Sequence, residues 1–162
     1  MKQNTTFSKI TVVLLFCLCT VFVNAQIVTN TNDDGPGSLR QEVMNAAPGA
    51  VITFAPATNG MPITLLSQIT IDQSITLTGN GPLNTILSGG NSTRIIEVTD
   101  GAAINFTGIT FTNGLAAING GALQVSATLP LTTTVTVINC VFENNEAQGA
   151  MAIQGGGAIH NS

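Results

Sequence analysis

The sequence predicts an all-β fold, a right-handed parallel β-helix (a solenoid) with a short N-terminal capping helix. Three observations predict it. A composition with no Tyr or Trp, 7% charged residues and 17 glycines favours strands and turns. The segments 104–114 and 135–145 repeat with one offset of 31 residues. Within each repeat, apolar residues alternate with Thr, Asn or Ser in short runs, as in strands that bury one face.

The two repeats match position by position. The equivalent pairs are Ile104/Val135, Phe106/Val137, Ile109/Cys140, Phe111/Phe142 and Asn113/Asn144. A glycine step follows each repeat, "NGGAL" at 119–123 and "GGGAI" at 155–159, and "ITIDQSITLTGNG" (69–81) has the same character in weaker register. Strands this short cannot bury an apolar face alone, whereas stacked coils can, so the repeats predict a solenoid with a continuous interior.

Stacking gives the conspicuous residues of the second repeat a structural role. Phe142 is expected to lie on Phe111, and Asn144 to align with Asn113 in a hydrogen-bonded ladder at a corner. Cys140 takes the place of Ile109 one coil later, so we expect it to be a small apolar core residue and not a reactive thiol.

A secretory signal peptide is expected over residues 1–25. Lys2 and Lys9 accompany the apolar segment 10–23, and Val23-Asn24-Ala25 offers small residues for cleavage before Gln26. The apolar segment is shorter than the ~20 residues that a spanning helix needs, which makes an uncleaved anchor the weaker alternative. The chain is therefore expected to be secreted or to lie at the cell outer membrane or cell surface.

Cleavage changes the charge and cysteine content. The mature chain would carry two arginines against eight acids, a net charge of −6, and so no basic footprint for nucleic acid or anionic lipid. Cys17 and Cys19 would leave with the peptide, and Cys140 alone cannot form a disulfide within the chain. We expect no metal, no cofactor and no transmembrane segment in the mature chain.

A short helix is predicted ahead of the solenoid. Ser38 followed by Gln41 has the spacing of a capping box, and Pro48-Gly49 would end the helix. Its apolar face consists of Leu39, Val43, Ala46 and Ala47. Such a helix would cover the open apolar end of the first coil. The expected organisation is a signal peptide (1–25), an N-terminal cap of strand, helix and strand (26–55), and β-helix coils (56–162).

No catalytic, cofactor-binding or metal-binding residue is predicted. Asp33 and Asp34 lie in the turn "NDDGPGS", and we favour a solvated turn because a calcium loop supplies several spaced oxygen ligands. Glycoside hydrolysis needs two carboxylates within roughly 5–10 Å of each other. The other acids form no column at the offset of 31; they are Glu42, Asp72, Glu97, Asp100, Glu143 and Glu146.

Three further features favour structural roles. Arg94 is expected to form a surface pair with Glu97, and His160 has no visible acid or nucleophile as a partner. The Thr-rich segment 127–137 is expected to be a lateral loop around Pro130 that runs into a strand with outward-facing threonines.

Two stretches carry a family resemblance. "VTNTNDDGPGSLRQEV" followed by "PGAVITF" resembles the N-terminal segment of bacterial secreted right-handed parallel β-helix repeat proteins. The coils are similar to polymorphic outer-membrane protein repeats, with a Phe-x-x-Asn step at Phe142–Asn145 and a Gly-Gly-Ala-Ile step at Gly156–Ile159; Phe111 departs from the first step, because Gly114 stands where Asn is expected. The resemblance implies a pectin-lyase-like fold and a surface or secreted location.

The function expected from these observations is that of a secreted or outer-surface structural, adhesin-like protein whose partners are extracellular polysaccharides or cell-surface molecules. The alternative is the N-terminal part of a carbohydrate-active β-helix enzyme, similar to a pectate lyase or a glycoside hydrolase, with its catalytic coils further along. The segment "GGGAIHNS" begins a new strand without a terminal cap, so the chain is expected to be a truncated fragment.

Overall fold

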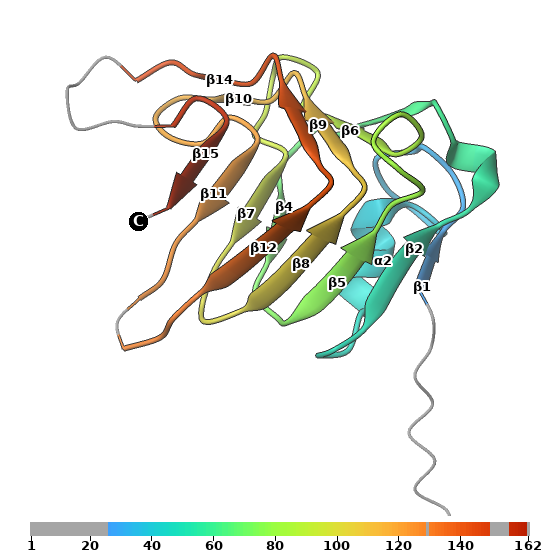
Figure 1. Cartoon of the computed structure of the whole chain (residues 1–162), viewed down its shortest axis with the longest axis horizontal. Coiled ribbons are helices and arrows are strands. Elements are labelled where there is room, and N and C mark those ends of the chain that lie inside the picture. Colours follow the sequence, from blue (N-terminus) through green and yellow to red (C-terminus); the bar gives the residue numbers. More distant parts are fainter. Residues whose placement is uncertain (1–25, 129, 150–155, 162) are drawn as a thin grey trace, which may run out of the picture.

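The chain winds into a parallel β-solenoid of about four turns in the computed structural model, which describes residues 26–128, 130–149 and 156–161. Figure 1 shows successive coils stacked side by side, with one short α-helix near the N-terminal end. The predicted parallel β-solenoid is confirmed. The predicted signal peptide lies outside the described residues.

Three strands recur at equivalent places in every coil. An N-terminal segment contains β1 (Gln26–Val28) and α2 (Leu39–Asn45). The first coil contains β2 (Val51–Phe54), the 3-10 turn η1 (Pro56–Thr58), β3 (Pro62–Thr64) and β4 (Ile69–Ile71), and the second contains β5 (Ile75–Thr78), β6 (Ile86–Ser88) and β7 (Ile96–Val98). The third contains β8 (Ala103–Thr107), β9 (Thr110–Thr112), β10 (Leu115–Ala116) and β11 (Leu123–Val125), and the fourth β12 (Thr134–Ile138), β13 (Val141–Glu143), β14 (Glu146–Ala147) and β15 (Ile159–Asn161).

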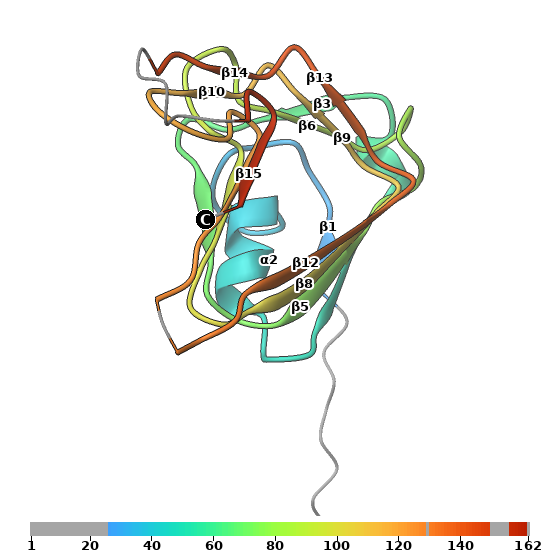
Figure 2. The same ribbon diagram turned by 60° about the vertical axis from the view of Figure 1, so that its left-hand side comes forward.

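Three parallel sheets form the walls around the interior (Figure 2). Sheet A has the strand order β1-β2-β5-β8-β12, sheet B the order β13-β9-β6-β3, and sheet C the order β15-β11-β7-β4. A short pair, β10 and β14, adds a fourth ladder in the last two coils. Apolar residues at alternate strand positions of these three sheets point inward, and those from β1 to β13 form one continuous core.

The 31-residue register is confirmed. Phe111 pairs with Phe142, and their rings stack with centroids 4.8 Å apart and planes inclined by 9°. Phe106 pairs with Val137 and meets Phe111 edge to face at 5.4 Å. The upstream coils are shorter, since Val51 pairs with Thr76 and Ile75 with Ile104, at offsets of 25 and 29 residues. Their unequal lengths explain why the repeat is weak in that part of the sequence.

Cys140 lies in the interior column, packed against the core as predicted, but it is only partly buried. Its neighbour in the preceding coil, Ile109, is fully buried. The difference arises because Ile109 has a coil on each side, whereas the described coils end with the one that holds Cys140.

The predicted asparagine ladder is formed by a different side chain. Asn113 and Asn144 hold equivalent corners in the left-handed conformation, with φ of 54° and 53°. The hydrogen bonds come from Asn145, whose Oδ1 accepts from the Gly114 N–H (2.8 Å) and whose Nδ2 donates to the Phe111 carbonyl (2.9 Å). Asparagine tolerates the left-handed corner, and the next residue then points back toward the preceding coil.

The glycine step allows close backbone stacking at the corner before sheet C. The Gly120 and Gly121 N–H groups donate to the carbonyls of Gly156 and Gly157 at 2.9 and 2.7 Å. A Cβ on Gly121 would lie 2.4 Å from the Glu146 carbonyl oxygen, so a larger residue cannot fit without a backbone shift. The predicted equivalence of Gly120 and Gly156 is therefore confirmed.

Helix α2 begins with half of the predicted capping box. The Ser38 Oγ accepts from the Gln41 N–H at 3.2 Å, while the Gln41 side chain donates to the Asn45 Oδ1 at 3.1 Å. Leu39 and Val43 are buried against the core, and Figure 2 shows the helix within the outline of the coils. Ala47 was predicted on this face but is exposed, because the helix ends at Asn45.

Candidate functional site

Sheet A, with five strands, is the largest of the sheets, and its outer side faces the viewer in Figure 1. We call the outward-facing residues of β2, β5, β8 and β12 the threonine face. Its members are Val51, Thr53, Thr76, Thr78, Ala103, Asn105, Thr107, Thr134, Thr136 and Ile138. The predicted outward-facing threonines of segment 127–137 are its last row, and the preceding Pro130 is exposed.

The register of sheet A aligns these side chains in columns. Thr53, Thr78 and Thr107 stack in one column, and in the next Thr76 stacks on Asn105. Neighbouring strands lie about 4.8 Å apart, so each column repeats hydroxyl and methyl groups at that interval. The Asn105 Nδ2 donates to the Thr76 Oγ1 at 3.4 Å, which links two rows.

No member of the threonine face is ionisable. Both arginines of the described residues and all eight acids of the chain lie elsewhere: in the N-terminal turn, in α2, at corners, on sheets B and C, or on β14. The face therefore offers hydrogen-bond donors, acceptors and methyl groups without charge. Only its last strand is predicted by the sequence.

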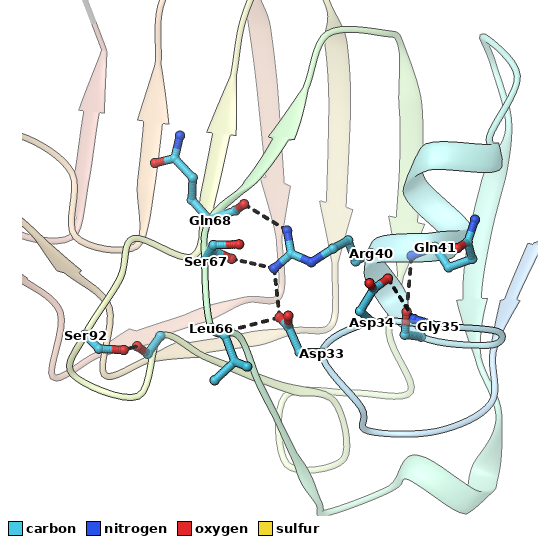
Figure 3. Close-up of polar contacts among 11 residues, drawn as sticks. Asp33, Asp34, Gly35, Arg40, Gln41, Leu66, Ser67, Gln68 and Ser92 are labelled. Atoms are coloured by element: carbon cyan, nitrogen blue, oxygen red, sulfur yellow. Dashed lines mark hydrogen bonds and ion pairs between the residues drawn. The ribbon is translucent and has the colours of Figure 1, made fainter.

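Asp33 forms a partly buried ion pair with Arg40, whereas the sequence predicted a solvated turn at this position (Figure 3). Its Oδ1 accepts from the Arg40 Nη2 at 2.8 Å and from the Leu66 N–H at 3.0 Å. Arg40 also donates to the carbonyls of Ser67 and Gln68 at 2.6 and 3.0 Å. The pair thus fastens the N-terminal segment to the corner between β3 and β4.

This environment changes the acidity of Asp33. Partial burial acts to raise the pKa of the carboxyl, but the hydrogen bonds from Arg40 and Leu66 and the guanidinium charge outweigh it, so the pKa lies below its ordinary value of 3.8. Asp34 is exposed, and its Oδ1 accepts from the Gly35 N–H at 2.7 Å. The prediction of a solvated turn therefore holds for Asp34 and is wrong for Asp33.

Arg94 performs a similar task two coils later. Its Nε and Nη2 donate to the carbonyls of Gly120 and Asn119 at 2.9 and 2.8 Å, and its Nη1 donates to the Gln68 Oε1 at 2.9 Å. The predicted pair with Glu97 is present, but at 3.9 Å it is the longest of these contacts. Since its side chain is 17% exposed and bound to the next coil, Arg94 is a structural residue between coils and not a surface residue.

The remaining acids are dispersed. Glu42 lies in the first turn of α2, Asp72 and Asp100 at corners between sheets C and A, and Glu143 and Glu146 in the last coil. The structure does align Glu97, Gln124 and His160 in one column on the outer side of sheet C. The sequence does not reveal this column, because its members belong to coils of unequal length.

Within residues 26–128, 130–149 and 156–161, no three His, Cys, Asp or Glu side chains gather as a metal site. In the same ranges no helix has the length and apolar character needed to cross a bilayer.

Comparisons with protein-family models, with curated proteins and with solved structures find no match to this chain. The parallel solenoid is thus established by the structure alone. The resemblance to polymorphic outer-membrane protein repeats remains a prediction from the sequence motifs.

Proposed function

We propose that this chain is a secreted or outer-surface structural protein whose threonine face binds an extracellular polymer, in the first instance an uncharged polysaccharide. The observation that carries the proposal is the regular, uncharged array of hydroxyl groups on sheet A. The apolar segment and small residues before Gln26 support export.

The geometry of the array suits a repeating ligand. A threonine hydroxyl both donates and accepts, so each row can form a hydrogen bond with a sugar hydroxyl either as donor or as acceptor. One such contact is weak, because it replaces a hydrogen bond to water and has a small net free energy. When several rows contact one polymer, the first contact raises the effective concentration of the polymer at the other rows. The combined avidity can then be useful without a deep pocket.

The same array favours holding a polymer over cleaving it. The threonine face provides no carboxylate or imidazole for proton transfer, and the acids lie on other surfaces of the described coils. The alternative function, a carbohydrate-active enzyme, would need catalytic coils outside the described residues.

The proposal is tested by cosedimentation with insoluble polymers. We expect the protein to sediment with at least one neutral polysaccharide among cellulose, chitin and β-1,3-glucan, and the double variant Thr78→Lys/Thr107→Lys to lose at least tenfold in affinity. Thr64→Lys, an exposed strand position on sheet B, is the matched control and should bind like the parent. Circular dichroism checks that all three proteins are folded.

Two results would contradict the proposal. One is a parent protein that sediments with none of the neutral polymers. The other is a folded double variant that binds as tightly as the parent, which would place the contact on another surface.

A further inference from the structure

The outer sides of the three sheets differ in exposure and in charge. On sheet B, the outward hydroxyl residues Ser88, Thr110 and Thr112 are buried, and the Thr110 hydroxyl already donates to a backbone carbonyl. The outer side of sheet C carries the charged or titratable side chains of Glu97 and His160. Among the walls of the described coils, only sheet A therefore presents outward threonines that are both accessible and free of charged neighbours in their own columns.

The central rows of the threonine face lie on β5, β8 and β12, which run side by side in Figure 1. Their outward threonines are half-buried or exposed. Within the described residues, the hydroxyl groups of Thr78, Thr107 and Thr136 have no hydrogen-bond partner on the protein. These hydroxyls are therefore available to whatever lies against the face.

The face repeats in two directions. Successive rows are about 4.8 Å apart along the solenoid, and outward residues within a row, such as Thr76 and Thr78, are two positions and thus about 6.6–6.8 Å apart. The parallel register keeps these positions aligned from β5 through β8 to β12. A single polymer chain needs repetition in one direction only, whereas a two-dimensional array matches the surface of a crystal.

We propose that the threonine face binds ice. Hexagonal ice is an uncharged lattice of water molecules, and one of its prism planes repeats at intervals close to the two spacings of the face. This inference goes beyond the proposed binding of a polymer, since the ligand is crystalline water, and the two proposals share only the surface.

The chemistry of threonine suits such a ligand. Its hydroxyl both donates and accepts, so it can replace a water molecule of the lattice. Its methyl group restricts the orientation of the water next to it. Because threonine is β-branched, its χ1 angle is restricted, and little side-chain freedom is lost when the face binds. A charged side chain would have to give up its hydration shell at an uncharged solid, which is costly.

The array is interrupted at Asn105. This residue lies between Thr76 and Thr136 in one column, and its Nδ2 donates to the Thr76 Oγ1 at 3.4 Å. It thereby occupies a hydroxyl of the preceding row and places an amide where the lattice repeat calls for a hydroxyl and a methyl group. Asn105→Thr would free the Thr76 hydroxyl and continue its column without a break.

Ice binding is tested by partition into slowly growing ice, using the protein recovered after expression with its own N-terminal segment. We expect the parent to be enriched in the ice fraction by roughly tenfold over Thr78→Lys/Thr107→Lys, since the many weak contacts of the array act together. Thr64→Lys, at an exposed position of sheet B, is the matched control and should partition like the parent. Circular dichroism checks that the three proteins are folded.

A gain of function tests the lattice match itself. Asn105→Thr is expected to increase thermal hysteresis, the gap between the melting and freezing temperatures, by roughly twofold, because it extends the regular array. Asn105→Ser supplies the hydroxyl without the methyl group or the restricted χ1 angle, so its increase should be smaller. Asparagine also forms hydrogen bonds, so neither change should improve binding to a polysaccharide to the same extent.

A parent protein that enters ice no more than the folded double lysine variant would overturn the proposal. So would a folded Asn105→Thr protein whose thermal hysteresis does not exceed that of the parent. Cosedimentation with neutral polysaccharides is measured on the same proteins. Sedimentation without enrichment in ice would refute ice binding and leave polymer binding intact, while enrichment without sedimentation would refute polymer binding alone.

Discussion

The two ends of the solenoid carry similar strands in different surroundings. At the N-terminal end, Leu39 and Val43 of α2 lie over the first coil and are buried with it. In the last coil, every strand is exposed or only partly buried, although its sequence repeats that of a coil whose inward-facing side chains are buried. The comparison shows that a solenoid coil obtains its burial from the neighbour stacked on it and not from its own sequence.

The largest expected effect compares the stacked phenylalanines. Phe111 is fully buried between Phe106 and Phe142, so Phe111→Ala should lower the free energy of unfolding by about 3–5 kcal/mol. Phe142→Ala should cost clearly less, because Phe142 is only partly buried. Urea unfolding followed by circular dichroism measures both, with Phe111→Leu as the conservative control. Equal losses at 111 and 142 would mean that the two coils are equally covered.

The next largest effect compares the free energy of unfolding after truncation of a core side chain in α2 and of one in the last coil. Leu39→Ala removes a fully buried side chain of the covering helix and should cost about 2–5 kcal/mol in unfolding free energy. Ile159→Ala in the last coil should cost less than about 1 kcal/mol, since much of its side chain is already exposed. The same urea titrations provide the comparison. A helix variant as stable as the parent would show that α2 does not protect the core.

A smaller effect is expected at the helix start. Ser38→Ala removes the acceptor for the Gln41 N–H and should lower the unfolding free energy by about 1 kcal/mol. Ser38→Asp keeps a capping oxygen and should restore most of the loss. If alanine and aspartate behave alike in the melting temperature, the Ser38 hydrogen bond contributes nothing.

The smallest effect depends on pH and involves the Asp33–Arg40 pair. The pKa of Asp33 is lower in the folded chain than its ordinary value of 3.8, so ionised Asp33 favours the folded state above that pH. The contribution is lost as the pH falls from about 3.8 through the folded-state pKa. Asp33→Asn should therefore be less stable than the parent at pH 6 and converge with it in strong acid. Unfolding free energies measured from pH 6 to pH 2 test this, and a constant difference would exclude it.

The fold could be predicted largely because its repeats leave a local signal. Alternation along each strand and the offset of 31 residues were sufficient to pair Phe111 with Phe142 and Ile104 with Val135. Ser38 and Gln41 likewise mark the start of α2 within a single turn of chain.

Contacts between coils could not be predicted in the same way. Arg40 and Arg94 bind backbone carbonyls 25 to 28 residues away. Because every residue has a backbone carbonyl, no sequence pattern can reveal which one an arginine binds. Asp33 was misjudged for this reason, since its partners include the Leu66 N–H. The threonine face was missed apart from its last strand, because its columns depend on a register that changes with the length of each coil.

The stacking of coils in this register is tested most directly by a disulfide between them. Ile109 precedes Cys140 in the same interior column, and the adjacent residues Thr110 and Val141 are paired. With Cys17 and Cys19 replaced by serine, Ile109→Cys should form a disulfide with Cys140 on mild oxidation, whereas Thr107→Cys, on the outer face, should not. A 109–140 disulfide identified by peptide mapping supports the account. A folded Ile109→Cys protein that keeps both thiols free under the same oxidation would contradict it.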